Sequence, residues 1–142
     1  GASVIWKRWP FENFIEISKH LIKQNFIPVF ILGPQERNLE RSLKKEFSKN
    51  KIIVVVSNDP LKTIEISRSC LAGISNDTGC GHLIASSGIP VLTLFGPTDS
   101  NKFSPLGNEK NVTISSQSIF KSKNIETIPV DLVLKEIKKI FN

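Results

Sequence analysis

The chain has 142 residues, of which 39% are hydrophobic and 23% are charged. This length and composition suit one globular domain with its own core and argue against a disordered segment. No apolar run approaches the roughly 18 residues that cross a bilayer, and no signal peptide is recognisable, so we expect a cytoplasmic protein. The two cysteines, Cys70 and Cys80, lack CxxC spacing, which predicts free thiols and neither a disulfide nor a zinc site.

A formal net charge of +6 would suit a polyanionic partner. However, the lysines are spread over several segments, and no aromatic residues alternate with them as a base-stacking surface requires. Nucleic acid is therefore the weakest hypothesis. A phosphorylated small molecule, or a position beside an anionic membrane surface, explains the charge at least as well.

Strand-like and helix-like segments alternate along the chain. Residues 2–6 are expected to form a strand, and a helix with apolar residues at Phe14, Ile17 and Leu21 follows Pro10. An apolar run at 29–32 predicts the next strand, and a charged amphipathic segment at 36–47 predicts the next helix.

The same alternation continues towards the carboxyl end. Strands are predicted at 52–56, 71–75 and 91–95, and helices at 60–69, 78–87 and 130–141. Gly88 follows the segment 78–87 as a typical C-cap residue. This rhythm predicts an α/β, Rossmann-like, doubly wound parallel sheet covered by helices on both faces, built as one domain over residues 1–142.

In such sheets, ligands bind at the carboxyl ends of the strands. Ser75 ends an apolar strand, and the residues from Asn76 to Gly79 form the turn into the next helix, with His82 in its first turns. Asp77 or Thr78 is expected to cap backbone N–H groups, and the glycines let a ligand approach. The turn is either an anion site at a helix start or simply a capped helix that needs no ligand.

The segment SNDTGCGHLIASSGIPVLTLFGPTD, residues 75–99, resembles the signature of glycosyltransferase family 9, the ADP-heptose:lipopolysaccharide heptosyltransferases. KRWPFENFIEISKHLI at 7–22 and VFILGPQE at 29–36 resemble two further elements of that family, in the same order. The resemblance implies the carboxyl-terminal, donor-binding half of a two-domain GT-B enzyme. The chain contains no Met, and we expect it to be a segment of a longer protein whose amino-terminal domain binds the acceptor.

The resemblance also implies roles for individual residues. Lys7 would contact the donor phosphates, and His82 would stabilise the departing nucleoside diphosphate, so both are predicted catalytic residues. The predicted donor-binding residues are Ser3, Lys7, Glu36, Asp77, Thr78, Gly79 and His82. Glu36 would accept hydrogen bonds from the ribose, although the same residue also suits a helix start. Phe95 to Asp99 are expected to shape the floor of the site.

The implied reaction moves a sugar, by default heptose from ADP-heptose, to a lipopolysaccharide-type acceptor. The general base is expected in the amino-terminal domain, so the chain alone should transfer nothing. The sequence has no DxD-type pair, and we predict neither a metal nor a cofactor beyond the donor. Two alternatives stay open: a GT-B enzyme that uses UDP or GDP, and a non-catalytic Rossmann-like module that binds an anion.

Overall fold

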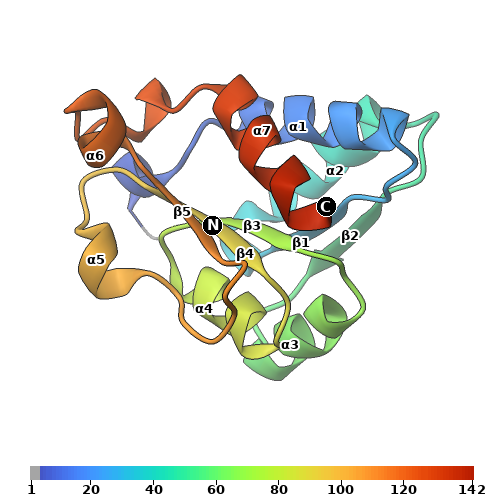
Figure 1. The fold of residues 1–142 in the computed structure, drawn as a ribbon. Coiled ribbons are helices and arrows are strands. Elements are labelled where there is room, and N and C mark those ends of the chain that lie inside the picture. Colours follow the sequence, from blue (N-terminus) through green and yellow to red (C-terminus); the bar gives the residue numbers. More distant parts are fainter. Residues whose placement is uncertain (1–3) are drawn as a thin grey trace.

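Helices cover both sides of parallel strands in a computed structural model that describes residues 4–142 (Figure 1). The predicted donor-binding residue Ser3 lies outside the described residues. The described elements are η1 (Ile5–Lys7), α1 (Phe11–Lys23), β1 (Val29–Leu32), η2 (Pro34–Glu36), α2 (Arg37–Glu46), β2 (Ile53–Val56), α3 (Pro60–Arg68), β3 (Gly73–Asn76), α4 (Gly79–Ser86), β4 (Val91–Phe95), α5 (Ser100–Phe103), β5 (Val112–Ser115), α6 (Ser116–Phe120), η3 (Ile125–Thr127) and α7 (Val130–Phe141).

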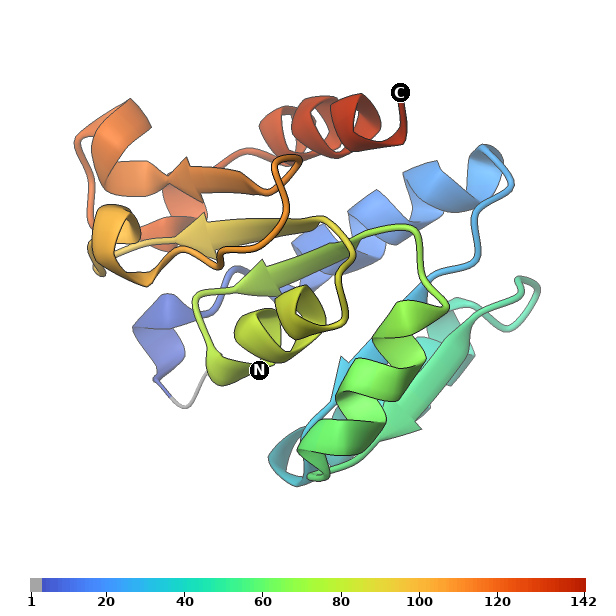
Figure 2. The ribbon, with the colours of Figure 1, turned by 60° about the horizontal axis from the view of Figure 1, so that its bottom comes forward.

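The strands form two sheets. β1 pairs with β2, β3 pairs with β4 and β4 pairs with β5, each time in parallel. Helices α1, α2 and α7 lie on one side of the strands, and α3 and α4 lie on the other (Figure 1). Figure 2 shows the β1–β2 pair set apart from β3. The predicted α/β fold with parallel strands is confirmed, but the single continuous sheet is not present among residues 4–142.

The strongest sequence patterns predicted the elements well. The strands at 29–32 and 91–95 and the helix at 130–141 have the predicted bounds. The strand predicted at 2–6 is wrong for its described residues. Ile5–Lys7 is a 3₁₀ helix in which Lys7 N–H donates to Val4 O at 3.1 Å. Ile5 and Trp6 are 76% and 69% exposed, so these apolar side chains are not part of the core of this fold.

The elements that the sequence did not predict are short. β5 has four residues, α5 four and α6 five. Asp99 caps α5 by accepting from Asn101 N–H, and Ser115 caps α6 by accepting from Ser118 N–H. Helices α5 and α6 are too short to show a helical apolar period, and β5 (VTIS) lacks the continuous apolar run that marks β1 (VFIL).

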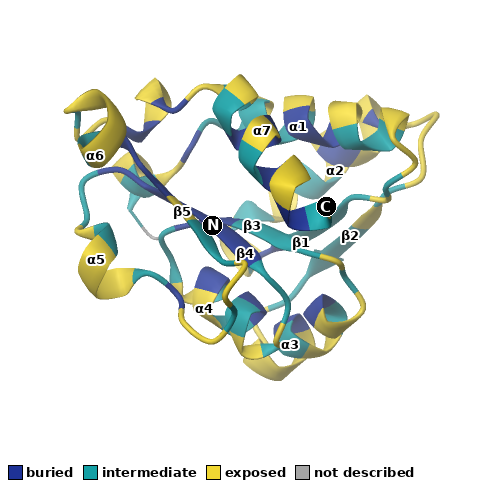
Figure 3. Ribbon diagram, viewed as in Figure 1, coloured by how far each residue is buried: buried dark blue, intermediate teal, exposed yellow. Residues whose placement is uncertain are grey.

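Two clusters of buried side chains form the core, and every residue of β4 is buried (Figure 3). The larger cluster joins Trp9 and Ile17 to β4, β5 and α7, and the smaller one consists of Leu32, Leu43 and Phe47. Helix α1 contributes to both, since Phe14 and Leu21 pack on the larger cluster and Phe11 and Ile15 pack on the smaller. Cys70 and Cys80 are free thiols, as predicted, but both are only half-buried.

Candidate anion-binding site

A cleft of about 690 Å³ lies where β1, β2 and β3 end. This volume is within the range of roughly 300–1,000 Å³ that is usual for small-molecule sites. The carboxyl ends of the strands form its floor, as expected for this fold. The residues that line it are Lys7, Arg8, Ile31, Leu32, Gly33, Gln35, Glu36, Ser57, Asn58, Asp59, Pro60, Thr63, Asp77, Thr78, Gly79, Cys80, His82 and Leu83.

Helix α4 begins at this cleft without a side-chain cap. Thr78 is the N-cap residue, but its side chain accepts no hydrogen bond from the helix, so the predicted cap is not formed. Instead, the Thr78 hydroxyl lies 3.5 Å from that of Ser75. A Cβ atom placed on Gly79 would have no atom within 4 Å, which leaves the backbone open at the first helical residue. The first N–H groups and the helix dipole therefore favour an anion here.

Gly81 has a different structural reason from Gly79. A Cβ atom on Gly81 would lie 3.1 Å from Ser75 Oγ, because the helix packs closely on β3 at this point. The first glycine of the Gly-Cys-Gly segment thus opens the site, and the second allows the helix to approach the strand.

Lys7 brings a positive charge to the start of α4. Its Nζ lies 3.2 Å from Asp77 Oδ2, and the two side chains are 30% and 10% exposed. Asp77 belongs to the same turn as Thr78 and Gly79, so its carboxylate holds the ammonium group of Lys7 beside that turn. The structure brings together four of the predicted site residues in this arrangement, namely Lys7, Asp77, Thr78 and Gly79.

Trp9 anchors the segment that carries Lys7. Its backbone N–H donates to Asn76 Oδ1 at 3.0 Å, and its indole N–H donates to Ile128 O at 2.9 Å. The ring is 2% exposed and meets Phe14 edge to face. Sequence reasoning missed Asn76, which is the residue that ties this segment to the end of β3.

Glu36 lines the cleft after the end of β1. Its Oε2 accepts a hydrogen bond from Gly33 N–H at 3.0 Å, which closes the turn into η2. Both interpretations of this residue therefore fit its position, since it supports a helix start and also lines the cleft.

His82 and Cys80 follow on α4. His82 is exposed at the cleft, so its imidazole can reach a bound oxyanion. Burial raises the pKa of the Cys80 thiol, which keeps this group neutral at physiological pH. A neutral thiol is a poor nucleophile, and Cys80 serves as part of the wall.

A second helix start, that of α3, also borders the cleft; the sequence predicted this helix but not its place at the site. Ser57, Asn58 and Asp59 follow β2 and line the cleft with Pro60. Asp59 caps α3 by accepting from Leu61 N–H at 3.0 Å, so one donor there is already satisfied. The rule that ligands lie at strand ends could have pointed to this loop, because it follows a predicted strand.

None of the residues from Phe95 to Asp99 lines the cleft, so the expectation that they shape the floor of the site is wrong, and Gly96 has a packing role instead. A Cβ atom on Gly96 would lie 2.9 Å from Ile125 Cβ, and Gly96 O accepts from Gln117 Nε2 at 3.0 Å. Neither Thr98 nor Asp99 lines the cleft. Among residues 4–142, no group of three or more His, Cys, Asp or Glu side chains is placed to hold a metal. None of the helices described over these residues is long and apolar enough to span a membrane.

Known heptosyltransferases resemble this chain in sequence and in fold. The pattern of glycosyltransferase family 9 (heptosyltransferase) matches residues 1–128. Lipooligosaccharide heptosyltransferase 2 of Haemophilus influenzae is 23% identical over 111 residues, and lipopolysaccharide heptosyltransferase 2 of Escherichia coli is 24% identical over 119. Each match covers 75% of this chain but only 32% of the relative, so the chain spans about one third of their length.

Solved structures share the fold over nearly the whole chain. The E. coli heptosyltransferase WaaC, solved with ADP, superposes with a TM-score of 0.84 at 20% identity, over 99% of this chain and 42% of that one. A family 9 glycosyltransferase from Veillonella parvula gives a TM-score of 0.82 at 22% identity, over 99% of this chain and 43% of the other. The predicted Rossmann-like fold of GT-B heptosyltransferases is confirmed.

Proposed function

Because the chain belongs to glycosyltransferase family 9, we propose that it is the donor-binding, carboxyl-terminal half of a GT-B glycosyltransferase. The proposed donor is a nucleoside diphosphate sugar, by default ADP-heptose, and the proposed acceptor is lipopolysaccharide or a similar glycan. The named relatives are heptosyltransferases, and WaaC was solved with ADP. These names support the choice of donor and acceptor.

One observation carries the proposal. The uncapped start of α4 opens into the cleft directly beside the Lys7–Asp77 pair. Helix N–H groups, an ammonium and an imidazole can all donate hydrogen bonds to a diphosphate, and here all three border one cleft. A helix that was only structural would gain from a side-chain cap at Thr78, which is not formed.

Each residue has a distinct part in the proposal. Lys7 and the backbone of Thr78 and Gly79 bind the diphosphate, and Asp77 positions Lys7. Glu36, which also lines the cleft, accepts hydrogen bonds from the ribose hydroxyls. His82 donates to the phosphate oxygen on which negative charge grows when the donor breaks.

The proposed reaction is a direct displacement. The acceptor hydroxyl oxygen forms a bond to the anomeric carbon while the bond from that carbon to the phosphate oxygen breaks. The nucleoside diphosphate leaves with the electron pair of the broken bond, and a general base takes the hydroxyl proton. We assign the base to the amino-terminal domain of the full-length enzyme, so this chain alone binds donor without transferring it.

A thermal-shift titration with ADP, UDP, GDP and ADP-heptose tests the proposal. Binding raises stability by RT ln(1 + [L]/Kd), so even a weak site responds to millimolar ligand. We expect a shift with the two adenine nucleotides that His82→Ala reduces and His20→Ala leaves intact. His20 is the matched control because it is exposed on α1 and does not line the cleft.

The alternatives give different results in the same titration. A shift with UDP or GDP alone supports a different GT-B enzyme. The absence of a shift with any nucleotide, in the full-length protein as well, contradicts donor binding and favours a module that binds another anion or none. A response to oligonucleotides that declines steeply with salt would point to nucleic acid.

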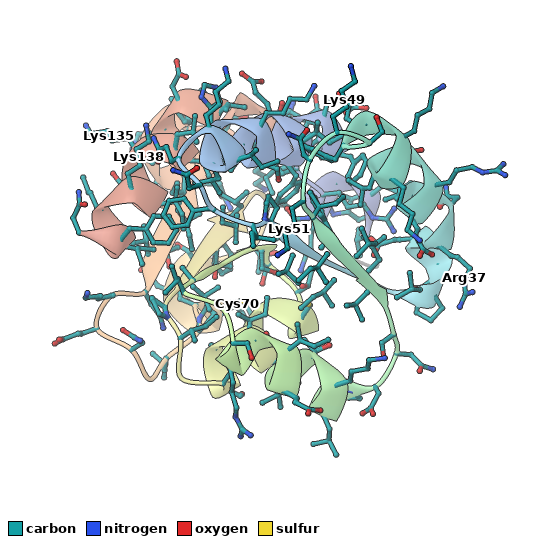
Figure 4. All side chains as sticks on the ribbon, turned by 90° about the vertical axis from the view of Figure 1, so that its right-hand side faces the viewer. Arg37, Lys49, Lys51, Cys70, Lys135 and Lys138 are labelled. Atoms are coloured by element: carbon teal, nitrogen blue, oxygen red, sulfur yellow. The ribbon has the colours of Figure 1, made fainter. Side chains whose placement is uncertain are left out.

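We propose that the protein acts in the cytoplasm, at the inner face of the cytoplasmic membrane. Exposed basic side chains support it, and Figure 4 shows Arg37, Lys49, Lys135 and Lys138 extending from the ribbon at separate places. These lysines belong to the turn after α2 and to α7, and all three are exposed. Anionic lipid headgroups attract such residues without any apolar insertion.

A further inference from the structure

Asn76, the last residue of β3, is a polar side chain in an apolar row of the sheet. Side chains alternate faces along a strand, and Ile74, two residues earlier, packs on the larger core cluster. The parallel register places Asn76 beside Leu94, which lies beside Ile114, and both of these belong to that cluster. Asn76 is 9% exposed. A buried amide costs free energy unless its polar atoms are hydrogen-bonded, so packing in the sheet does not explain an asparagine here.

The side-chain oxygen of Asn76 holds a backbone group from a distant part of the chain. Its Oδ1 accepts from Trp9 N–H at 3.0 Å, in a buried hydrogen bond between residues 67 positions apart. The preceding N–H group, that of Arg8, bonds within its own segment, to Ile5 O at 2.9 Å. Trp9 N–H, by contrast, bonds to β3. Asn76 therefore fixes the segment that follows η1 to the carboxyl end of the sheet.

The residue after Asn76 holds a side chain of the same segment. Asp77 accepts from Lys7 Nζ at 3.2 Å, and its own N–H donates to Leu94 O at 2.9 Å, which ties this end of β3 to β4. Consecutive residues of one strand thus hold a backbone group and an ammonium group that belong to neighbouring parts of one short segment. Because α4 begins at Gly79, directly after this turn, the two contacts set the position of the ammonium group relative to the helix start.

We propose that Asn76 is a positioning residue for the donor diphosphate, which acts by fixing Lys7 at the start of α4. The inference rests on the proposed function, in which Lys7 binds the phosphates. Asn76 does not line the cleft itself, so it acts through Lys7 and touches no donor atom. A lysine that is already held in place loses less conformational freedom when it binds an anion, which raises the affinity.

A double-mutant cycle for ADP binding by the full-length protein tests this inference. Isothermal titration calorimetry compares the wild type with Lys7→Ala, Asn76→Leu and the double variant. We expect a loss of affinity of about tenfold or more for Lys7→Ala and of about three- to tenfold for Asn76→Leu. The double variant should bind ADP within about twofold of Lys7→Ala alone, because a residue that acts through Lys7 then has nothing left to position. A general loss of stability would instead weaken binding in both backgrounds.

Asn111 provides a matched control. Its Oδ1 accepts from Val91 N–H at 2.9 Å, at the amino end of β4, and it does not line the cleft. Asn111→Leu removes the same kind of bond, so we expect a lower melting temperature, as for Asn76→Leu, but an ADP affinity within about twofold of the wild type. If the leucine variants do not fold, Asn76→Ala and Asn111→Ala remove the same acceptors and leave space for water.

Three results would overturn the inference and leave donor binding in place. Asn76→Leu would bind ADP as tightly as the wild type, or it would weaken binding equally with and without Lys7, or Asn111→Leu would weaken binding as much as Asn76→Leu. An unchanged affinity of Lys7→Ala would overturn the inference together with the role of Lys7. Failure of the wild type to bind ADP would contradict the proposed function itself, and the inference with it.

Discussion

Lys7 reaches the cleft because residues on either side of it are fixed to β3 and to the core. Asp77 pairs with its ammonium group, and the buried Trp9 holds the backbone two residues further along. A lysine on a mobile arm would lose side-chain freedom on binding an anion. Here part of that loss has already occurred on folding.

We expect Lys7→Ala to weaken ADP binding by about tenfold or more, because a charge-assisted hydrogen bond to phosphate is lost. Isothermal titration calorimetry measures the change, and Lys23→Ala is the matched control, since Lys23 is exposed in the last turn of α1 and does not line the cleft. Equal affinities for both variants would contradict the role of Lys7.

At the scale of the element, the two helices that start at the cleft differ in how their first turns are satisfied. Asp59 caps α3 through Leu61 N–H, whereas Thr78 makes no such bond at α4. The difference matches the proposed division of labour, in which α3 is a wall and α4 is the binding element.

Removing each N-cap side chain tests this difference between the start of α3 and the start of α4. We expect Asp59→Ala to lower the free energy of unfolding by about 1 kcal/mol, which is the typical value of an N-cap bond. Thr78→Ala should change it by less than about 0.5 kcal/mol, because no cap bond is lost. Urea denaturation provides both values, and a larger loss for Thr78→Ala would show that its hydroxyl stabilises the turn.

Two glycines give a second comparison, Gly96 directly after β4 and Gly79 at the start of α4. Gly96→Ala would place a Cβ atom 2.9 Å from Ile125 Cβ and 3.1 Å from Lys123 O, so we expect destabilisation by about 1–3 kcal/mol. Gly79→Ala meets nothing within 4 Å and should fold normally, but its methyl group stands where the anion is proposed to bind. Thermal denaturation followed by ADP titration distinguishes the packing role from the binding role.

At the scale of the whole molecule, the cleft and the exposed lysines of α7 lie on different faces. The cleft lies at the carboxyl ends of β1, β2 and β3, while Lys135 and Lys138 lie on α7, which covers one side of the sheets (Figure 1). A membrane in contact with Lys135 and Lys138 of α7 would therefore leave the cleft open to a soluble donor.

Vesicle sedimentation tests the membrane contact. We expect binding to phosphatidylglycerol vesicles but not to phosphatidylcholine vesicles, with a loss on adding salt, because exposed charges are screened. Replacing Lys135 and Lys138 by Glu should reduce binding by about tenfold or more, at roughly 1 kcal/mol per charge. The same change at Lys62 on α3 and Lys110 in the turn before β5, both exposed, is the control. Equal binding of both double variants would reject α7 as the contact.

Local pattern determined most of the elements and the location of the site. The apolar runs at 29–32 and 91–95 and the amphipathic period of 130–141 each depend on neighbours in the chain, so a sequence reading finds them. The strand-to-helix turn at Asn76 to Gly79 is equally local. Its chemistry, small and polar residues after an apolar strand, predicts without any tertiary information either an anion site or a capped helix start.

Only the tertiary structure decided which distant residues meet. The pairing of Lys7 with Asp77, the anchoring of Trp9 by Asn76 and the use of Ser57 to Asp59 as a wall join segments far apart in sequence. β5 exists because β4 offers it a partner, and residues 5–7 form a turn of helix despite their apolar sequence. Such outcomes depend on packing and on which backbone groups find partners, and these are properties of the assembled fold.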